Sequence, residues 1–387
     1  MRVLYINHNA ANGGLYGGNK VILNLISVLN EEIEIAMVFP SDGLFVQKCN
    51  QIGIKAYVIP RYHLKLFPSK KTIEDKIYYP KHLLGMILRR QFAIRKLTKI
   101  AEEFNPDIIH SIVGPLDIGY VVAKKKGIPH VWHLQEYQDK DFNMRPFPSM
   151  KNYRKHLHES NNHVVCITKD IFKHFELDQQ KDKVIYNGIF DERKNNYKKE
   201  KKPYFLFVGS LGKAKGVIPL LNAFAEYIRK GGSCDLKFAA GWVEPYGTKL
   251  KNIIQKEGIG DKVQFLGYRD DVYELMSEAM ALIVPSLCEG FGLITAEAMY
   301  NNCLVIGRNS GGTKEQFDNG KTLTGKEIAL RFENDDQLAQ LLFEVEQNGQ
   351  QYYLEMIGRA FKTVNSLYTK RVFANNMLEY YKQILSK

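Results

Sequence analysis

The chain of 387 residues has few cysteines and no long apolar run. Its five cysteines are scattered and never form a C-x-x-C pair, so neither a disulfide framework nor a cysteine-based zinc site is predicted. No apolar stretch reaches the ~18 residues of a bilayer-spanning helix, because Arg89 and Arg90 interrupt the best candidate. The first residues, MRVLYINHNA, lack the pattern of a signal peptide, and we expect a cytoplasmic protein.

The sequence also lacks a metal-ligand pattern and internal repeats. His156 and His158 stand two positions apart on a predicted helix, so they point to different faces and are not expected to share a metal. We find no short-period repeat and no low-complexity tract, which excludes solenoids and disordered arrays. The 45% hydrophobic and 25% charged residues are typical of a globular protein with ample core.

Short apolar strands alternate with amphipathic helices, and this order predicts an α/β fold with parallel, doubly wound sheets. Strands are predicted near residues 3–7, 33–39, 55–59, 108–110, 130–133, 163–167 and 184–186, then near 204–209, 236–240, 263–267, 281–285 and 303–307. The charged run at 191–203 reads as a linker between two domains, and residues 368–384 predict a long amphipathic helix.

The most informative segment is PSLCEGFGLITAEAMYNNCLVIGRNSGGTKE, residues 285–315. A helix starting near Gly292 would place Glu297 in its second turn and Glu289 in the loop before it, so both carboxylates can border one pocket with the free amides of the helix start. Amides suit phosphates and carboxylates suit hydroxyls, which indicates a nucleotide sugar as ligand. The alternative is an ordinary strand-turn-helix with two solvated glutamates.

This segment resembles the E-x7-E signature of the retaining glycosyltransferases of family 4, which have the GT-B fold. The matching residues are Ser286, Glu289, Gly290, Phe291, Gly292, Glu297, Ala298, Gly311, Gly312 and Glu315, and Leu293 is carried over with them as donor-binding. The resemblance implies two Rossmann-like domains facing each other across a cleft, with residues 1–190 on the acceptor side and 191–367 binding the donor. It also implies that the terminal helix, within 368–387, packs back on the first domain; the sequence alone equally allows packing on the second.

A glycine-rich loop follows the first predicted strand. Gly13, Gly14, Gly17 and Gly18 precede a helix, but the spacing GG-x-x-GG differs from the G-x-G-x-x-G of dinucleotide-binding folds, which argues against NAD. In family 4 the matching loop comes close to the donor phosphates or the acceptor, so Gly17 and Gly18 are expected to bind. The alternative is a tight turn with no ligand.

A second loop, within YFLFVGSLGKAKG at residues 204–216, matches the family's diphosphate-binding loop. Gly209 and Lys215 match, whereas Ser210 stands where the family has an arginine, which removes a bidentate cation. Lys213 is expected to substitute in part as a point charge. The alternative is a pair of solvated lysines in a βα loop.

Smaller matches complete the resemblance. KVIYNGI at 183–189 looks like the segment that ends the family's first domain, and His133 in WHLQEY matches a histidine at the cleft, although Leu134 replaces the acidic residue that usually follows. Tyr268 and Arg269 match the loop near the nucleotide base. Asp139 and Asp141 imitate a D-x-D metal motif, but GT-B enzymes generally need no metal, and neither a metal nor a cofactor beyond the UDP- or GDP-sugar cosubstrate is expected.

The resemblance assigns roles and a reaction. Glu289, Lys215 and His133 are the expected catalytic residues, with Glu289 on the sugar hydroxyls and Lys215 on the leaving diphosphate, while Glu297 binds the ribose. The expected reaction moves a hexose-type sugar, with retention, to a glycan or lipid-linked saccharide, as in bacterial surface polysaccharide assembly. An epimerase-like enzyme or phosphorylase of the same fold and a basic nucleic-acid-binding protein are alternatives, and the last lacks any known motif.

Charge indicates where the acceptor lies. The chain carries a net charge of +12, and residues 61–102 hold eleven Lys or Arg against three Asp or Glu, interleaved with aromatic and aliphatic residues. Such a segment suits docking on an anionic membrane surface, which would make the protein peripheral on the inner face of the membrane. The alternative is a solvated charged helix.

Overall fold

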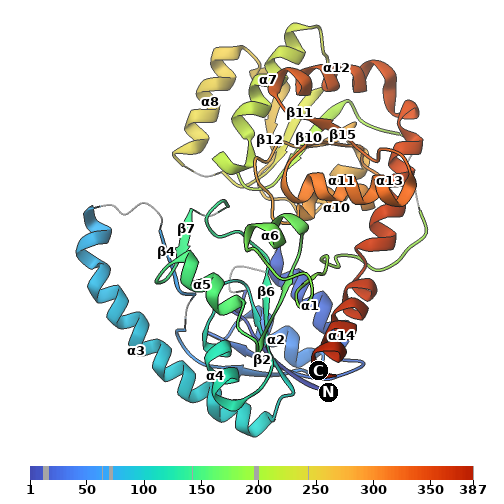
Figure 1. Cartoon of the computed structure of the whole chain (residues 1–387). Coiled ribbons are helices and arrows are strands. Elements are labelled where there is room, and N and C mark those ends of the chain that lie inside the picture. The colour runs from blue at the N-terminus through green and yellow to red at the C-terminus, as the bar shows by residue number, and fades with distance from the viewer. Residues whose placement is uncertain are drawn as a thin grey trace. The chain divides into compact units, whose positions relative to one another are not determined.

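The computed structural model describes residues 1–11, 17–62, 64–68, 73–141, 143–195, 200–242 and 244–386. The chain divides into two compact units, one formed by Met1–Ile189 with Lys370–Lys387 and the other by Phe190–Thr369. Each unit has its own parallel sheet and its own core (Figure 1).

Unit 1 is built on a seven-stranded sheet with strand order β3-β2-β1-β5-β6-β8-β9. The strands are β1 (Arg2–Ile6), β2 (Glu34–Phe39), β3 (Lys55–Val58), β5 (Ile108–Ile112), β6 (His130–Leu134), β8 (Asn162–Cys166) and β9 (Lys183–Val184). All neighbouring strands run parallel, as the alternation of strands and helices predicts.

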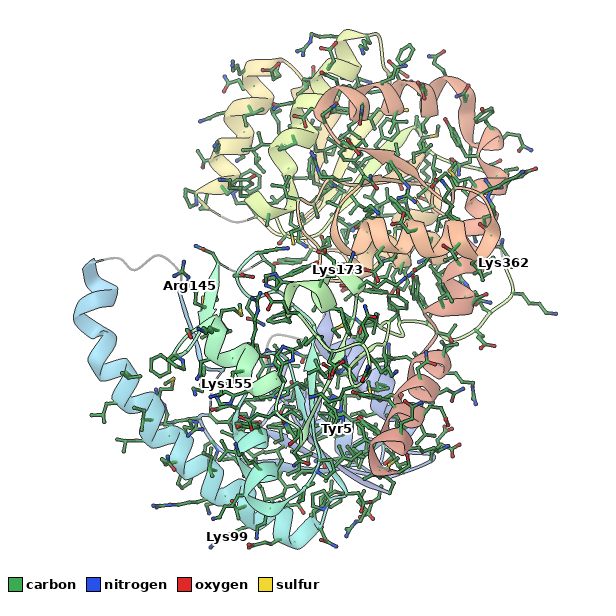
Figure 2. The ribbon with its side chains drawn as sticks, in the orientation of Figure 1. Tyr5, Lys99, Arg145, Lys155, Lys173 and Lys362 are labelled. Carbon is green, nitrogen blue, oxygen red and sulfur yellow. The ribbon has the colours of Figure 1, made fainter. Side chains whose placement is uncertain are left out.

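The helices of unit 1 are α1 (Gly18–Leu29), α2 (Leu44–Gln51), α3 (Ile73–Phe104), α4 (Ile118–Lys126), α5 (Met150–Leu157), α6 (Lys169–His174) and α14 (Lys370–Leu385). Side chains of a strand alternate between faces. Accordingly, Leu4 and Ile6 of β1 join a core with α3 and α4, whereas Tyr5 points to the other face and shares a 2.6 Å hydrogen bond with Tyr381 of α14. Tyr5 thus lies inside the unit (Figure 2).

An antiparallel ribbon of β4 (Leu66–Pro68) and β7 (Met144–Pro146) was not predicted from the sequence. Each strand has three residues and joins segments far apart in the chain. Such short strands carry no readable alternation of apolar and polar residues, so only the tertiary pairing defines them.

Unit 2 has a six-stranded parallel sheet in the order β12-β11-β10-β13-β14-β15. Its strands are β10 (Tyr204–Val208), β11 (Asp235–Ala239), β12 (Val263–Phe265), β13 (Ala281–Val284), β14 (Val305–Arg308) and β15 (Leu330–Phe332). β15 was absent from the predicted strands, since its three residues are also too few for a pattern.

The helices of unit 2 are α7 (Val217–Arg229), α8 (Tyr246–Glu257), α9 (Val272–Glu278), α10 (Leu293–Tyr300), α11 (Gly311–Thr324), α12 (Asp335–Tyr352) and α13 (Leu354–Leu367), with 3-10 turns at Lys213–Lys215 and Gly260–Lys262. The apolar sides of α7, α8 and α12 pack on the sheet through Leu220, Phe224, Leu250 and Leu342. The two parallel sheets confirm the predicted α/β, doubly wound fold class.

The last helix returns to unit 1. The hydroxyl of Tyr381 on α14 shares one hydrogen bond with the hydroxyl of Tyr5 and another with Nδ1 of His110, each at 2.6 Å. The hydroxyl of Tyr380 donates to the carbonyl of Lys181 at 2.9 Å. α14 lies beside α1 in Figure 1. Among the described residues, no helix combines the length and the hydropathy needed to cross a bilayer.

Candidate active site

Three neighbouring strands of unit 2, β10, β13 and β14, end at the same edge of the sheet. Each is followed by a helix, α7, α10 and α11, and no side chain caps the first turn of any of the three. The first amides of a helix have no partner within the helix, so an anion can bind there. The carboxyl edge of this sheet therefore gathers three helix starts around one place.

The loop between β10 and α7 interlocks with the loop after β13. The amide of Leu287 donates to the carbonyl of Ala214 at 2.9 Å. Gly216 has a φ of 66°, and a Cβ on it would overlap the carbonyl oxygen of Pro285. Only glycine fits both the left-handed backbone and this close approach, and the contact fixes where Lys215 lies.

Lys215 and Glu289, which the sequence assigned to one site, form an ion pair. Nζ of Lys215 donates to Oε1 of Glu289 at 2.7 Å, with 33% of the lysine side chain and 14% of the glutamate side chain exposed. The two charges compensate each other at a place that solvent still reaches. An entering phosphate can therefore compete for the lysine, which is the more exposed of the two side chains.

Helix α11 donates hydrogen bonds to the turn that carries Glu289, Gly290 and Phe291. The amide of Gly312 donates to the carbonyl of Glu289 at 2.9 Å, and Nε2 of Gln316 donates to the carbonyl of Phe291 at 2.6 Å. A Cβ on Gly311 would come within 2.8 Å of the carbonyl oxygen of Glu289, so a glycine is needed there. This packing presents the Glu289 carboxylate and leaves Gly292 and Leu293 to start α10.

Glu297 lies in the second turn of α10, as the sequence predicts. The hydroxyl of Tyr273 on α9 donates to Oε1 of Glu297 at 3.2 Å. Tyr273 thus orients the carboxylate, a partner that the sequence did not reveal because the two residues lie on different helices.

Tyr268 and Arg269 follow β12, three strands from β13 in the sheet order. With ~4.8 Å between neighbouring strands, this is roughly 14 Å away. Tyr268 is 90% exposed, and its ring covers Gly241 so closely that a Cβ on this glycine would overlap the ring. Arg269 donates to Oδ1 of Asp271 at 2.8 Å, so its charge is engaged locally.

Gly209, Ser210 and Lys213 precede Lys215 at the end of β10. The amide of Gly209 donates to the carbonyl of Ala239 at 3.3 Å, which continues the pairing of β10 with β11. Ser210 and Lys213 are exposed to solvent. Where the family has an arginine, this chain therefore has an exposed serine, and Lys213 and Lys215 are the cations of the loop.

The remaining expected residues lie in unit 1. Gly17 and Gly18 begin α1, and a Cβ on Gly18 would come within 2.7 Å of Oε1 of Gln135, so a glycine lets Gln135 lie over the helix start. Gly13 and Gly14 lie outside the described residues. Gln135 follows β6, and no role was predicted for it, because a glutamine after a strand is a common feature.

His133 lies in β6 and is completely buried. Its ring contacts those of His110, at a centroid distance of 5.3 Å, and Phe373 of α14, at 6.1 Å. Neither ring nitrogen has a hydrogen-bond partner among the described residues, and burial lowers the pKa of His133 to about 3. The imidazole is therefore neutral at physiological pH and part of the interior of the unit.

Glu136, three residues further on, has different properties. Burial and the nearby charge of Asp141 raise the pKa of Glu136 to about 7, and Nε2 of Gln138 donates to its Oε2 at 3.0 Å. A carboxyl group with such a pKa gains and loses protons near neutral pH, which suits acid–base chemistry. The sequence around Glu136 does not predict the raised pKa, because the shift comes mainly from burial. Within the described part of the chain, no cluster of three His, Cys, Asp or Glu side chains could hold a metal ion.

The two units are both α/β, and each contains a parallel sheet of its own, as in the GT-B glycosyltransferases. The family model described as "Glycosyl transferases group 1" matches residues 189–363, and that described as "Glycosyltransferase Family 4" matches residues 17–193. Together the two models cover most of the chain, and the protein belongs to glycosyltransferase family 4.

Curated relatives support this membership at low identity. The chain is 33% identical to the O-antigen chain mannosyltransferase RfbU of Salmonella typhimurium over 37% of this chain and 41% of that one. It is 26% identical to the N-acetyl-alpha-D-glucosaminyl L-malate synthase of Bacillus anthracis over 65% of this chain and 69% of that one. The match to RfbU thus spans less than half of that protein's length.

Solved structures share the fold. HepE of Anabaena, in complex with UDP, superposes with a TM-score of 0.74 over 99% of this chain and 100% of that one, at 17% identity. The lipopolysaccharide outer core galactosyltransferase WaaB, in its apo form, gives a TM-score of 0.70 over 99% of each chain, at 18% identity. At these identities the likeness shows the GT-B fold alone, and it confirms the fold expected from the sequence.

Proposed function

We propose that the protein is a retaining glycosyltransferase that moves a hexose-type sugar from a UDP- or GDP-sugar to a glycan or a lipid-linked saccharide, in bacterial surface polysaccharide assembly. The observation that carries the proposal is the Lys215–Glu289 ion pair of 2.7 Å at an edge where three helix starts meet. This edge offers cationic and amide donors to a diphosphate and a carboxylate to sugar hydroxyls, side by side. UDP in the HepE structure and the mannosyl transfer named for RfbU support the substrate class.

The reaction breaks the bond between the anomeric carbon and the phosphate oxygen. Positive charge develops on the sugar and negative charge on the leaving diphosphate. Lys215 and the first amides of α7 and α10 stabilise the diphosphate, and this electrostatic stabilisation requires no metal. Glu289, released from Lys215 when the phosphates arrive, accepts hydrogen bonds from the sugar and favours the positive charge beside it.

The nucleoside extends from this point along the same edge. Glu297, oriented by Tyr273, accepts the ribose hydroxyls, and Tyr268 offers an exposed ring to the base. The roughly 14 Å between the ends of β13 and β12 suits the length of a nucleoside diphosphate. A lipid-linked acceptor would place this reaction at a membrane surface.

The test separates turnover from binding. Glu289→Gln keeps the shape of the side chain and removes its charge, so turnover falls by ~10² or more, equivalent to about 2.7 kcal/mol, over a panel of UDP- and GDP-hexoses. Its affinity for UDP or GDP is not weakened, because Lys215 loses its competing partner. Glu297→Gln does the reverse and weakens nucleotide binding by ~1–3 kcal/mol, as measured by titration calorimetry.

The matched control is Glu355→Gln, which changes an exposed carboxylate on α13 to the same amide. It should alter neither turnover nor binding. If Glu289→Gln and Glu297→Gln both retain the transferase and donor-hydrolysis rates of the parent on a donor that the parent uses, this edge is not the donor site.

A further inference from the structure

The long helix α3 exposes an apolar stripe. Leu84, Leu88 and Phe92 are 59%, 62% and 45% exposed, and Ile87 beside them is 43% exposed. These positions follow the spacing i, i+4, i+8 and share one side of the helix, whereas Ala93, Leu97 and Ala101 on the opposite side are buried in unit 1. Large apolar side chains gathered on one exposed helix face indicate a contact surface.

The same side of α3 is basic. Residues 83–101 contain five Lys or Arg and no Asp or Glu. Arg95, Lys96 and Lys99 are exposed, and Lys99 projects from the surface in Figure 2. Lys96 places its ammonium group 5.8 Å from the ring centroid of Phe92, so apolar and cationic groups mix on the face. We call Leu84, Ile87, Leu88, Phe92, Arg95, Lys96 and Lys99 the α3 face.

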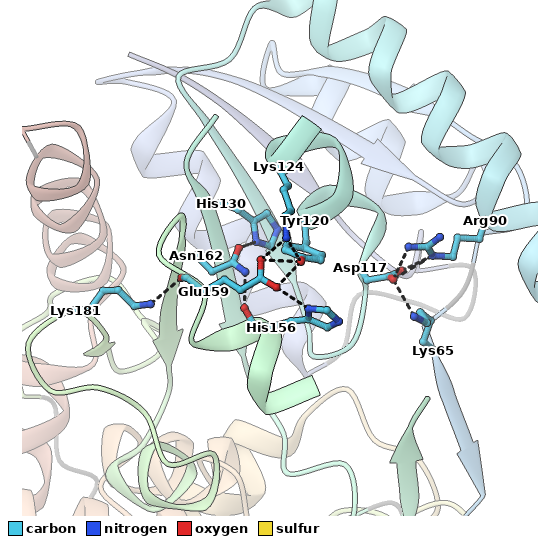
Figure 3. A network of polar contacts seen from close by, with 10 residues as sticks. All are labelled: Lys65, Arg90, Asp117, Tyr120, Lys124, His130, His156, Glu159, Asn162 and Lys181. Atoms are coloured by element: carbon cyan, nitrogen blue, oxygen red, sulfur yellow. Dashed lines mark hydrogen bonds and ion pairs between the residues drawn. The ribbon is translucent and has the colours of Figure 1, made fainter. Parts of the chain in front are cut away.

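An internal ion pair fixes which side of α3 points outward. Arg90 donates to both oxygens of Asp117, from Nε at 3.1 Å and from Nη2 at 2.8 Å, and Nζ of Lys65 donates to the same carboxylate at 3.1 Å (Figure 3). The side chains of Arg90 and Asp117 are 23% and 14% exposed. Arg90 is therefore turned toward α4 and is not part of the α3 face, although the charge count of residues 61–102 includes it.

We propose that the α3 face docks the protein on an anionic lipid bilayer, with Leu84, Leu88 and Phe92 entering the boundary between headgroups and acyl chains. The basic residues complement the negative surface of such a bilayer, and an amphipathic helix with aromatic and aliphatic residues lies in that boundary. A second copy of the chain fits worse, because a symmetric contact would bring the same cations together without a carboxylate among residues 83–101. The α3 face lies in unit 1 and the proposed donor site in unit 2, so vesicle binding can be measured separately from nucleotide binding.

The experiment measures cosedimentation of the full chain with vesicles of phosphatidylcholine containing about one third phosphatidylglycerol, and with phosphatidylcholine alone. The parent protein binds the anionic vesicles, and added salt weakens this binding. Removing the three charges in Arg95→Gln, Lys96→Gln, Lys99→Gln lowers the affinity on the order of 100-fold, at ~1 kcal/mol for each cation near the surface. Removing the apolar stripe in Leu84→Ser, Leu88→Ser, Phe92→Ser lowers it at least ~10-fold.

Two control variants make the same kinds of change elsewhere, at two positions each. Lys249→Gln with Lys256→Gln removes exposed cations of α8, and Leu323→Ser with Tyr352→Ser removes exposed apolar side chains of unit 2. Both bind vesicles as the parent does. Binding of UDP and GDP by every variant shows that the chains are folded, and it tests the proposed function separately. If the parent binds vesicles but no nucleotide, the docking proposal stands and the proposed glycosyltransferase function is contradicted.

Three outcomes overturn the proposal. The first is a parent protein that ignores anionic vesicles, and the second is an α3-face variant that binds them as well as the parent. The third is a parent that elutes as a dimer in size-exclusion chromatography while the stripe variant elutes as a monomer, since the face would then be covered by a second copy.

Discussion

Gly216→Ala tests whether the close contact of two loops builds the proposed donor site. Gly216 has a φ of 66°, and a Cβ there would overlap the carbonyl oxygen of Pro285. Two costs therefore add. The left-handed backbone costs ~1 kcal/mol for alanine, and relief of the overlap costs a further ~2 kcal/mol, as for an overpacked core position.

The chain supplies a matched control for the first cost. Gly258 ends α8 with the same φ of 66°, and a Cβ there would meet no heavy atom within 4 Å. Gly258→Ala therefore loses only the free energy of the left-handed backbone conformation. Its melting temperature falls by roughly 2–4 °C, the shift per kcal/mol for a domain of this size. Gly216→Ala, at ~3 kcal/mol, falls by roughly 6–12 °C.

The decisive measurement is nucleotide binding. To relieve the overlap, the loop of Lys215 moves away from Pro285 and the 2.7 Å contact with Glu289 is lost. UDP or GDP affinity, measured by calorimetry well below the melting temperature, should fall at least ~10-fold in Gly216→Ala, because Lys215 moves away from the place where the diphosphate binds. It should stay unchanged in Gly258→Ala. Equal melting temperatures and equal affinities in the two variants would falsify the role given to this contact.

Two further predictions concern unit 1. Burial lowers the pKa values of His130 and His133 to about 3, so the unfolded chain binds more protons than the folded one between pH ~3 and 6.5. The two neutral histidines therefore contribute fully to the free energy of unfolding above pH 6.5, and this contribution falls with pH, by ~2 kcal/mol for each histidine at pH 5. Urea unfolding at pH 7 and pH 5 measures this difference. His133→Asn should show a smaller pH dependence than the parent. Asp117→Asn leaves Lys65 and Arg90 without their shared negative charge and should destabilise the protein by ~1–3 kcal/mol. Asp178→Asn makes the same change at a more exposed turn and serves as the control. Unchanged hydrogen exchange in residues 83–104 of Asp117→Asn would contradict the view that these ion pairs hold α3 in place.

The strands and the start of α10 could be predicted because they depend on local patterns. Buried parallel strands read as short apolar runs, and Gly292 marks the end of the turn before α10. The sequence also brought Lys215 and Glu289 to one site, but through a family resemblance, since the two residues are 74 positions apart. No local pattern contains the distance between them.

What could not be predicted depends on tertiary contacts. The pairing of β4 with β7, the bond of Tyr273 to Glu297 and the turn of Arg90 toward Asp117 join separate elements, and none follows from periodicity. The burial of His133 also escaped the sequence, because a histidine in a strand reads the same whether its side faces solvent or α14. Charge counting alone placed Arg90 with the surface cations, whereas the structure gives it an internal partner.

The return of α14 to unit 1 has a consequence for how the chain is made. Tyr5 and Tyr381 share a hydrogen bond although 376 positions separate them, and the whole of Phe190–Thr369 is synthesised between the two parts of unit 1. At ~5–20 residues per second, this segment takes roughly 10–40 s to emerge from a ribosome. Throughout that interval, the surface of β1 and α1 that α14 covers in the complete protein stays uncovered. Unit 2 is therefore the first part of the nascent protein that is able to complete its core.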